Sequence, residues 1–158
     1  MKKIGTYTVR GSVLTDRAAH KIQLFDGKFD TGYRLVSFEM FPSALDSGNF
    51  TSVSGKLSTA ELPLPTAAAE AFNADNNAEI AWSLFFYDAT PASNPFDLGP
   101  FTVIDPDNLI VEDLYLYVSE NSSSAYSDVK VNYIMTFEKY EFNDWQGALS
   151  MVRNRSQA

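Results

Sequence analysis

The chain has 158 residues, 45% of them hydrophobic and 14% aromatic, which is enough apolar surface for one hydrophobic core. Its formal net charge of −8 argues against binding to nucleic acids, because such binding normally relies on Lys and Arg neutralising phosphates, and it disfavours adsorption to anionic membranes. The absence of cysteine excludes disulfides, thiolate metal sites and cysteine nucleophiles. No secretory signal follows Lys2 and Lys3, and no apolar run has the length of a membrane span. We therefore expect a soluble chain made in a cytoplasm, with one domain over residues 1–142.

The N-terminal third of the chain predicts β-strands, because apolar and polar residues alternate with the period of two of a pleated strand. The predicted strands are residues 4–14, 20–25 and 33–41, with a weaker one at 50–57. Asp26-Gly27 follows the second strand and is a hairpin signal, because glycine takes the positive φ of tight turns. Pro42 is expected to end the third strand, since it has no backbone N–H to donate.

The middle of the chain mixes one predicted helix with further strands. Thr66 is a suitable N-cap for a short helix over residues 67–72. Residues 80–87 are apolar on both faces, which is typical of a central strand covered on both sides. Residues 91–100, with three prolines, form an expected loop, and residues 101–104 a short strand.

Two long alternating segments near the C-terminus give the strongest signal for β-structure. They span residues 109–120 and 129–142, and the serine-rich stretch 121–127 between them predicts that they are antiparallel neighbours. In the second segment one face carries Val129, Val131, Tyr133, Met135 and Phe137. In the first, Leu114, Leu116 and Val118 face one way and Val111, Tyr115 and Tyr117 the other. After Phe142 the spacing of Trp145, Ala148, Leu149 and Val152 predicts a C-terminal helix capped by Asn143 or Asp144, and the remainder of 143–158 is a polar tail.

These segments together predict an all-β fold, an antiparallel β-sandwich of about eight strands with a short internal helix and a short C-terminal helix. The strand order is not determined by these patterns. A jelly roll and another Greek-key sandwich both remain open.

No catalytic or metal site is predicted. His20 is the only histidine and no nucleophile motif accompanies it, so a structural role is favoured. Acidic residues cluster at Asp26 and Asp30 and over residues 105–113, and their carboxylates are possible calcium ligands. None of these stretches matches an EF-hand loop, and capping of turns is the simpler explanation. Paired carboxylates of the glycosidase kind cannot be recognised from spacing, and no cofactor motif is present.

Candidate interaction residues are aromatic, apolar or basic. Tyr115, Tyr117, Tyr126 and Trp82 are candidates for a sugar-stacking platform, although core or subunit-interface packing is favoured for them. The C-terminal helix would present Trp145, Leu149 and Val152, followed by Arg153 and Arg155. This element either docks on an acidic surface of a neighbouring subunit or folds back over one end of its own sandwich, and the second alternative is slightly favoured.

The layout of dense strands, proline-rich loops and long terminal strands without cysteine resembles the single jelly-roll structural proteins of viruses, including capsid and capsid-decorating subunits. This resemblance implies an eight-stranded sandwich that tiles or decorates a particle. The acidic charge and the lack of a basic N-terminal arm favour an outward-facing subunit over one that contacts the genome. We therefore expect a non-enzymatic virion component, made in a host cytoplasm, that forms homo-oligomers or binds other structural subunits without cofactor or metal. The alternative is a β-sandwich module that binds carbohydrate or another ligand, and an enzyme ranks third.

Overall fold

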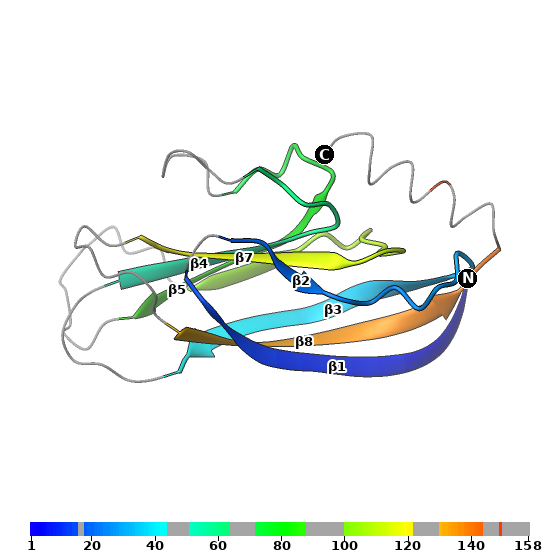
Figure 1. Ribbon diagram of the computed structural model, residues 1–158, viewed down its shortest axis with the longest axis horizontal. Helices are drawn as coiled ribbons and strands as arrows, with labels where there is room; N and C mark the ends of the chain where they lie inside the picture. Colours follow the sequence, from blue (N-terminus) through cyan, green and yellow to red (C-terminus); the bar gives the residue numbers. More distant parts are fainter. Residues whose placement is uncertain are drawn as a thin grey trace.

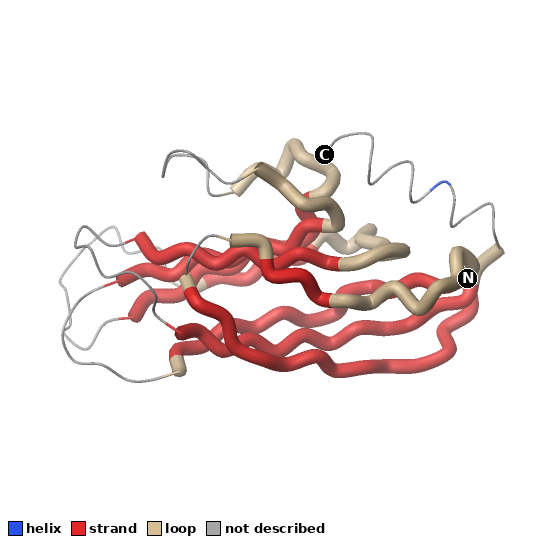
Figure 2. Tube along the Cα trace, viewed as in Figure 1, coloured by secondary structure: helices blue, strands red, loops and turns tan. Residues whose placement is uncertain are grey.

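The fold consists almost entirely of antiparallel β-structure (Figure 2). The computed structural model describes residues 1–15, 18–43, 51–63, 72–87, 100–121, 130–143 and 149. The strands within these residues are β1 (Lys2–Leu14), β2 (His20–Ile22), β3 (Thr31–Pro42), β4 (Thr51–Ser58), β5 (Glu79–Tyr87), β6 (Phe101–Ile104), β7 (Leu114–Asn121) and β8 (Lys130–Glu141). The strands predicted at 4–14, 33–41 and 80–87 therefore match β1, β3 and β5 closely, and β3 ends at Pro42 as expected.

The strands form two sheets that face each other as two layers (Figure 1). The three-stranded sheet has the order β1-β8-β3, and the five-stranded sheet has the order β2-β7-β4-β5-β6. The hydrophobic core lies between the layers. The predicted grouping of these side chains is confirmed, because Val131, Met135 and Phe137 of β8 and Leu114, Leu116 and Val118 of β7 are all completely buried in one cluster.

The prediction that the two long C-terminal segments are neighbours is wrong. β8 is the central strand of the three-stranded sheet, where it pairs with β1 and β3. β7 lies in the other sheet, between β2 and β4. Each of the two strands buries a strong apolar face, and opposite layers let these two faces pack against each other in the core. A serine-rich connection does not distinguish a hairpin from a crossing between layers.

The predicted hairpin at Asp26-Gly27 is also wrong, although the turn itself is present. Gly27 has a φ of 86°, as expected. β2 and β3 nevertheless belong to different sheets, so the turn carries the chain from one layer to the other. The carboxylate of Asp26 accepts hydrogen bonds from the backbone N–H of Lys28 and the hydroxyl of Thr31, and its Oδ2 lies 2.7 Å from the Nζ of Lys139 on β8. These contacts attach the turn to the three-stranded sheet.

The predicted strand at 109–120 is two pieces in the structure. Ile110 forms an isolated antiparallel bridge with Tyr33 of β3, with two N···O distances of 2.7 Å, and β7 begins only at Leu114. Residues 105–113, which we call the crossing segment, therefore contact the three-stranded sheet before the chain enters the five-stranded sheet. The change of layer requires a bend, which explains why one periodic segment of sequence does not form one strand.

Asn108 fixes the middle of the crossing segment. Its side chain is buried, its Oδ1 accepts the backbone N–H of Leu35 at 2.7 Å, and its Nδ2 donates to the carbonyls of Leu35 and Asp105. The backbone N–H of Asp105 donates to the carbonyl of Ile80 on β5 at 2.9 Å. The amide of Asn108 thus links the two layers.

The predicted helices fall largely outside the described residues. Of the internal helix at 67–72 only Phe72 is described, and it is not helical. Of the C-terminal helix after residue 143 only Leu149 is described, in helical conformation. Within the described ranges, the structure contains no helix with the length and hydrophobicity to cross a membrane.

We predict that Asn108→Ala destabilises the fold. The substitution leaves the buried N–H and carbonyl of Leu35 without the partner that Asn108 supplies, and a loss of about 3 kcal/mol in the free energy of unfolding is expected. Urea unfolding at neutral pH measures this loss. Asp107→Ala, an exposed change in the same turn, is the matched control. An equal, small effect of both variants would contradict the role given to Asn108.

Candidate functional site

The outer face of the five-stranded sheet is partly covered by its own chain (Figure 1). Leu62 and Ala78, from the connection between β4 and β5, pack there against Tyr117, which is only 5% exposed. The hydroxyl of Tyr117 accepts the backbone N–H of Leu62 at 2.5 Å and donates to the carbonyl of Leu62 at 3.3 Å. Burial raises the pKa of Tyr117 above its ordinary value. In this conformation Tyr117 offers little surface to a sugar or a partner.

A buried carboxylate holds the same covering connection in place. Glu79 begins β5, and its Oε1 lies 2.8 Å from the Nζ of Lys56 on β4. Its Oε2 accepts the indole N–H of Trp82 and the backbone N–H of Asn73, each at 2.8 Å. Every described partner of Glu79 therefore belongs to the outer face or to its cover. The carboxylate of Glu79 therefore orients the indole of the half-buried Trp82 and ties the cover to the sheet.

A pocket with acidic and aromatic walls opens beside this cover. It has a volume of about 250 Å³ and is lined by Phe25, Thr59, Ala60, Glu61, Glu112, Asp113 and Tyr115. We call it the acidic pocket. Its walls come from three parts of the chain: the turn after β2, the connection after β4, and the junction of the crossing segment with β7. Tyr115 is half-buried in it, so this predicted interaction residue does reach a concave surface.

Asp113 is the structural member of the acidic pocket. Its Oδ1 accepts the backbone N–H groups of Leu24 and Phe25, and its Oδ2 lies 3.0 Å from the Nζ of Lys21. Burial alone would raise the pKa of the Asp113 carboxyl, but the hydrogen bonds from Lys21, Phe25 and Leu24 outweigh it and hold the pKa below its ordinary value. Asp113 is therefore a carboxylate at neutral pH and fastens the turn after β2.

The turn-capping explanation of the acidic clusters is confirmed for Asp26, Asp105 and Asp113, each of which accepts a backbone N–H near a turn. Among the residues that the structure describes, no group of three or more His, Cys, Asp or Glu side chains has the arrangement of a metal site. His20 is half-buried at the start of β2, where it pairs with Leu116.

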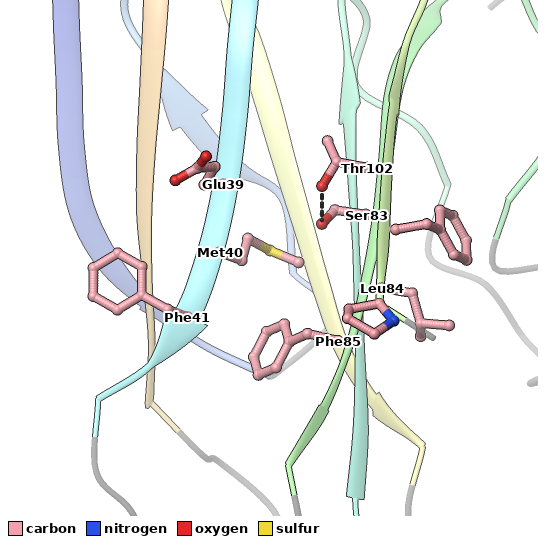
Figure 3. Close-up of a pocket in the computed structure, with 9 residues that line it drawn as sticks. Glu39, Met40, Phe41, Ser83, Leu84, Phe85 and Thr102 are labelled. Carbon is pink, nitrogen blue, oxygen red and sulfur yellow. Dashed lines mark hydrogen bonds between the residues drawn. The ribbon is translucent and has the colours of Figure 1, made fainter. Parts of the chain in front are cut away.

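A second concave region lies where the two layers diverge at β3 and β6 (Figure 3). This cleft also has a volume of about 250 Å³, and residues 39–41, 83–85 and 100–102 line it. Met40 points into it from β3, opposite a hydrogen bond of 3.1 Å between the hydroxyls of Ser83 and Thr102. Phe41 and Phe101 on its walls are 49% and 36% exposed, and the neighbouring Val103 is 53% exposed. Phe101 and Val103 are in register with Leu84 and Trp82 on the outer face of the five-stranded sheet, and we call these two residues of β6 the apolar edge. Phe41 points away from the cleft on the other side of β3 (Figure 3).

Of the remaining interaction candidates, only Leu149 lies among the residues that the structure describes. Leu149 is 55% exposed. Trp145, Val152, Arg153, Arg155 and Tyr126 lie outside the described residues, so the predictions for these residues stay predictions.

Sequence reasoning missed Phe25 and Glu61 in the acidic pocket, Phe41 beside the cleft, and Phe101 and Val103 on the apolar edge. The pocket is assembled from segments more than 30 residues apart, and no local pattern brings them together. The alternation of residues 101–104 shows a strand but not that β6 lies at the end of the five-stranded sheet.

No protein-family model matches the chain, and neither a curated protein nor a solved structure shows a match to it. Any functional inference therefore depends on the geometry of the chain itself.

We predict that Asp113 makes the stability of the fold depend on acidic pH. Because its pKa is lower in the folded state, its contribution is fully present above the unfolded value of about 3.9 and is lost as the pH falls through the folded value. Urea unfolding from pH 7 to pH 2.5 should show Asp113→Asn to be less stable than the wild type by about 1 to 3 kcal/mol at pH 7, with the difference shrinking in acid. Asp107→Asn controls for the charge. A difference that does not change with pH would contradict this assignment.

Proposed function

We propose that the chain is a jelly roll, in which one long hairpin of strands is folded over into two layers. The pairs β1 with β8, β2 with β7 and β4 with β5 are those of such a hairpin. The remaining pair, β3 with β6, is supported by two features: the bridge of Tyr33 to Ile110 just after β6, and the cleft that β3 and β6 line together. β6 itself is hydrogen-bonded to β5.

The function that this geometry supports best is that of a non-enzymatic structural subunit, which associates with copies of itself or with other subunits of a particle. The observation that carries the proposal is the apolar edge, where Phe101 and Val103 of β6 remain exposed at the end of the five-stranded sheet. Exposed apolar side chains and the ends of sheets both favour association with another chain. β6, with the sequence Phe-Thr-Val-Ile, carries no charged residue that would oppose it.

A role as an outward-facing capsid or decoration subunit of a virion is the specific form of this proposal. It rests on fold-level resemblance to viral jelly-roll proteins, which is an analogy and carries no site of its own. The net charge of −8 supports a position away from packaged nucleic acid. Such a subunit would be made in the host cytoplasm and incorporated into the particle.

The apolar edge gives a direct test of association. Phe101→Glu with Val103→Glu places two charges in the proposed contact, so we expect the wild type to form oligomers at micromolar concentrations and the double variant to be monomeric. Sedimentation equilibrium across a range of salt concentrations measures this difference. Leu14→Glu with Val36→Glu, at exposed apolar positions on β1 and β3, is the matched control and should leave assembly intact. A wild type that stays monomeric at millimolar concentration would refute the proposal.

A second candidate function, carbohydrate binding, is favoured by one feature, the half-buried Tyr115 beside carboxylates in the acidic pocket. Tyrosine rings stack on sugar faces and carboxylates accept hydrogen bonds from hydroxyls. The platform is small, because Tyr117 on the same face is covered by Leu62. For this reason it ranks below assembly.

Glycan-array binding tests the second candidate. If the acidic pocket holds a sugar, Tyr115→Ala should abolish binding by the full chain, because it removes the stacking surface. Tyr117→Phe is the control, since it removes only a hydroxyl that is used inside the chain. No binding by the wild type, or equal binding by Tyr115→Ala, would contradict this candidate.

A further inference from the structure

One edge of the three-stranded sheet is open along the whole of β1 (Figure 1). Among the residues that the structure describes, β8 is the only strand that pairs with β1, and none is hydrogen-bonded to the backbone of β1 on its other side. β1 has 13 residues, and all of them are exposed or half-buried. An edge of this kind can accept a further strand, because its outward N–H and C=O groups can continue the ladder.

The charges of β1 select the kind of strand that it can accept. β1 contains Lys2, Lys3 and Arg10 and no acid, so its charge is +3 in a chain of net charge −8. Lys3 is already bonded to Glu138 of β8. Arg10 is exposed, lies opposite the apolar Ile134, and forms no ion pair or hydrogen bond with its side chain in the described part of the chain. Such cations oppose pairing with a like-charged strand and favour a partner with carboxylates.

The two faces of β1 ask for different side chains from an added strand. On the core side, Tyr7 is in register with the completely buried Phe137, yet Tyr7 itself is 51% exposed because the sheet ends at β1. On the opposite side, Thr6, Thr8 and Arg10 are all exposed. Successive residues of a strand point to opposite faces. An added strand would therefore place apolar residues over Tyr7 and acidic residues beside Arg10, in alternation.

The sheet ends of a second copy do not have this chemistry. Of the described strands, β1, β2, β3 and β6 lie at the ends of the two sheets. β2 contains Lys21 and no acid, β3 contains Arg34 and Glu39, and β6 has no charged residue. None of these strands has a negative net charge. A nucleic acid is anionic, but it has no peptide groups to continue the ladder, and the net charge of −8 repels it.

We propose that β1 binds an extended segment of a different protein, with alternating apolar and acidic residues, as a fourth strand of the three-stranded sheet. Main-chain hydrogen bonds along β1 supply affinity, and the contacts of Tyr7 and Arg10 supply specificity. This inference goes beyond the proposed function, because it requires neither the apolar edge nor association between copies.

A peptide of this chemistry tests the site on the full chain. The probe is a labelled synthetic peptide as long as β1, in which valine alternates with glutamate and threonine. We expect saturable binding in fluorescence anisotropy that weakens with salt. Hydrogen exchange should slow at amides of β1 and stay unchanged at those of β6. The same peptide with glutamine in place of glutamate should bind about tenfold more weakly.

Backbone methylation separates strand addition from a simple attraction of charges. Two further peptides keep every side chain and carry N-methyl groups on alternate residues, one in each of the two possible phases. Only one edge of an added strand faces β1, and methyl groups on that edge remove the N–H donors of the ladder. We therefore expect one of the two peptides to lose binding and the other to bind as the unmethylated peptide does.

Arg10→Gln tests the protein side of the contact. It removes the cation without a partner and should weaken binding of the acidic peptide about fivefold. Lys28→Gln, an equal change of charge at an exposed position in the turn after β2, is the control and should bind as the wild type does. Phe101→Glu with Val103→Glu should also bind the peptide fully. Circular dichroism and thermal unfolding verify that each variant is folded.

The outcomes separate this inference from the proposed function. The inference is overturned if the acidic peptide does not bind, if neither methylated peptide loses binding, if Arg10→Gln binds as the wild type does, or if protection falls only on other strands. Single-stranded DNA that displaces the peptide and depends equally on Arg10 shows a site for polyanions and also overturns it. Self-association that is lost on Arg10→Gln shows a second copy at β1 and overturns the choice of partner. A wild type that binds the peptide but stays monomeric overturns only the proposed assembly.

Discussion

The attachment of the crossing segment to both layers is the constraint on which the rest of the structure depends. Asp105 bonds to β5, Asn108 and Ile110 bond to β3, and Asp113 bonds to the turn after β2. Two sheets that share only an apolar core can slide, because hydrophobic contact has little directional preference. Buried hydrogen bonds with fixed geometry remove that freedom. The crossing segment determines where β7 begins, and the residues at this junction line the acidic pocket.

The distribution of polar groups separates structural from functional chemistry in this protein. Glu79 and Asp113 are committed to neighbours inside the chain, and the structure gives each of them at least three partners. Glu61 and Tyr115 instead line a surface pocket, and Phe101 and Val103 lie at a sheet edge. These side chains, unlike Glu79 and Asp113, lie at the acidic pocket and the apolar edge, where another molecule can reach them. The acidic pocket and the apolar edge differ in chemistry, because carboxylates and aromatic rings line the first and exposed apolar side chains form the second.

Local periodicity predicted the strands well but not their partners. The alternation along β8 identified Val131, Met135 and Phe137 as core residues, and the structure buries all three. The same pattern carries no information about the layer in which a strand lies, which is why β7 and β8 were paired incorrectly. Asp26-Gly27 showed a turn, and its positive φ is present, but only the contact with Lys139 from 113 residues away shows which sheet the turn joins. The acidic pocket could not be predicted from the sequence for the same reason, because Phe25, Glu61 and Glu112 come together only in the folded chain.

The central position of β8 also determines when the fold can form during synthesis. β1 and β3 do not pair with each other, and each completes its ladder only with β8, whose last residue is Glu141. A ribosome must therefore synthesise the chain through β8 before this sheet can exist. Until then β1 and β3 present open edges, and pairings between residues so distant in sequence form slowly. Open strand edges favour association between unfinished molecules, and the net charge of −8 opposes it by mutual repulsion.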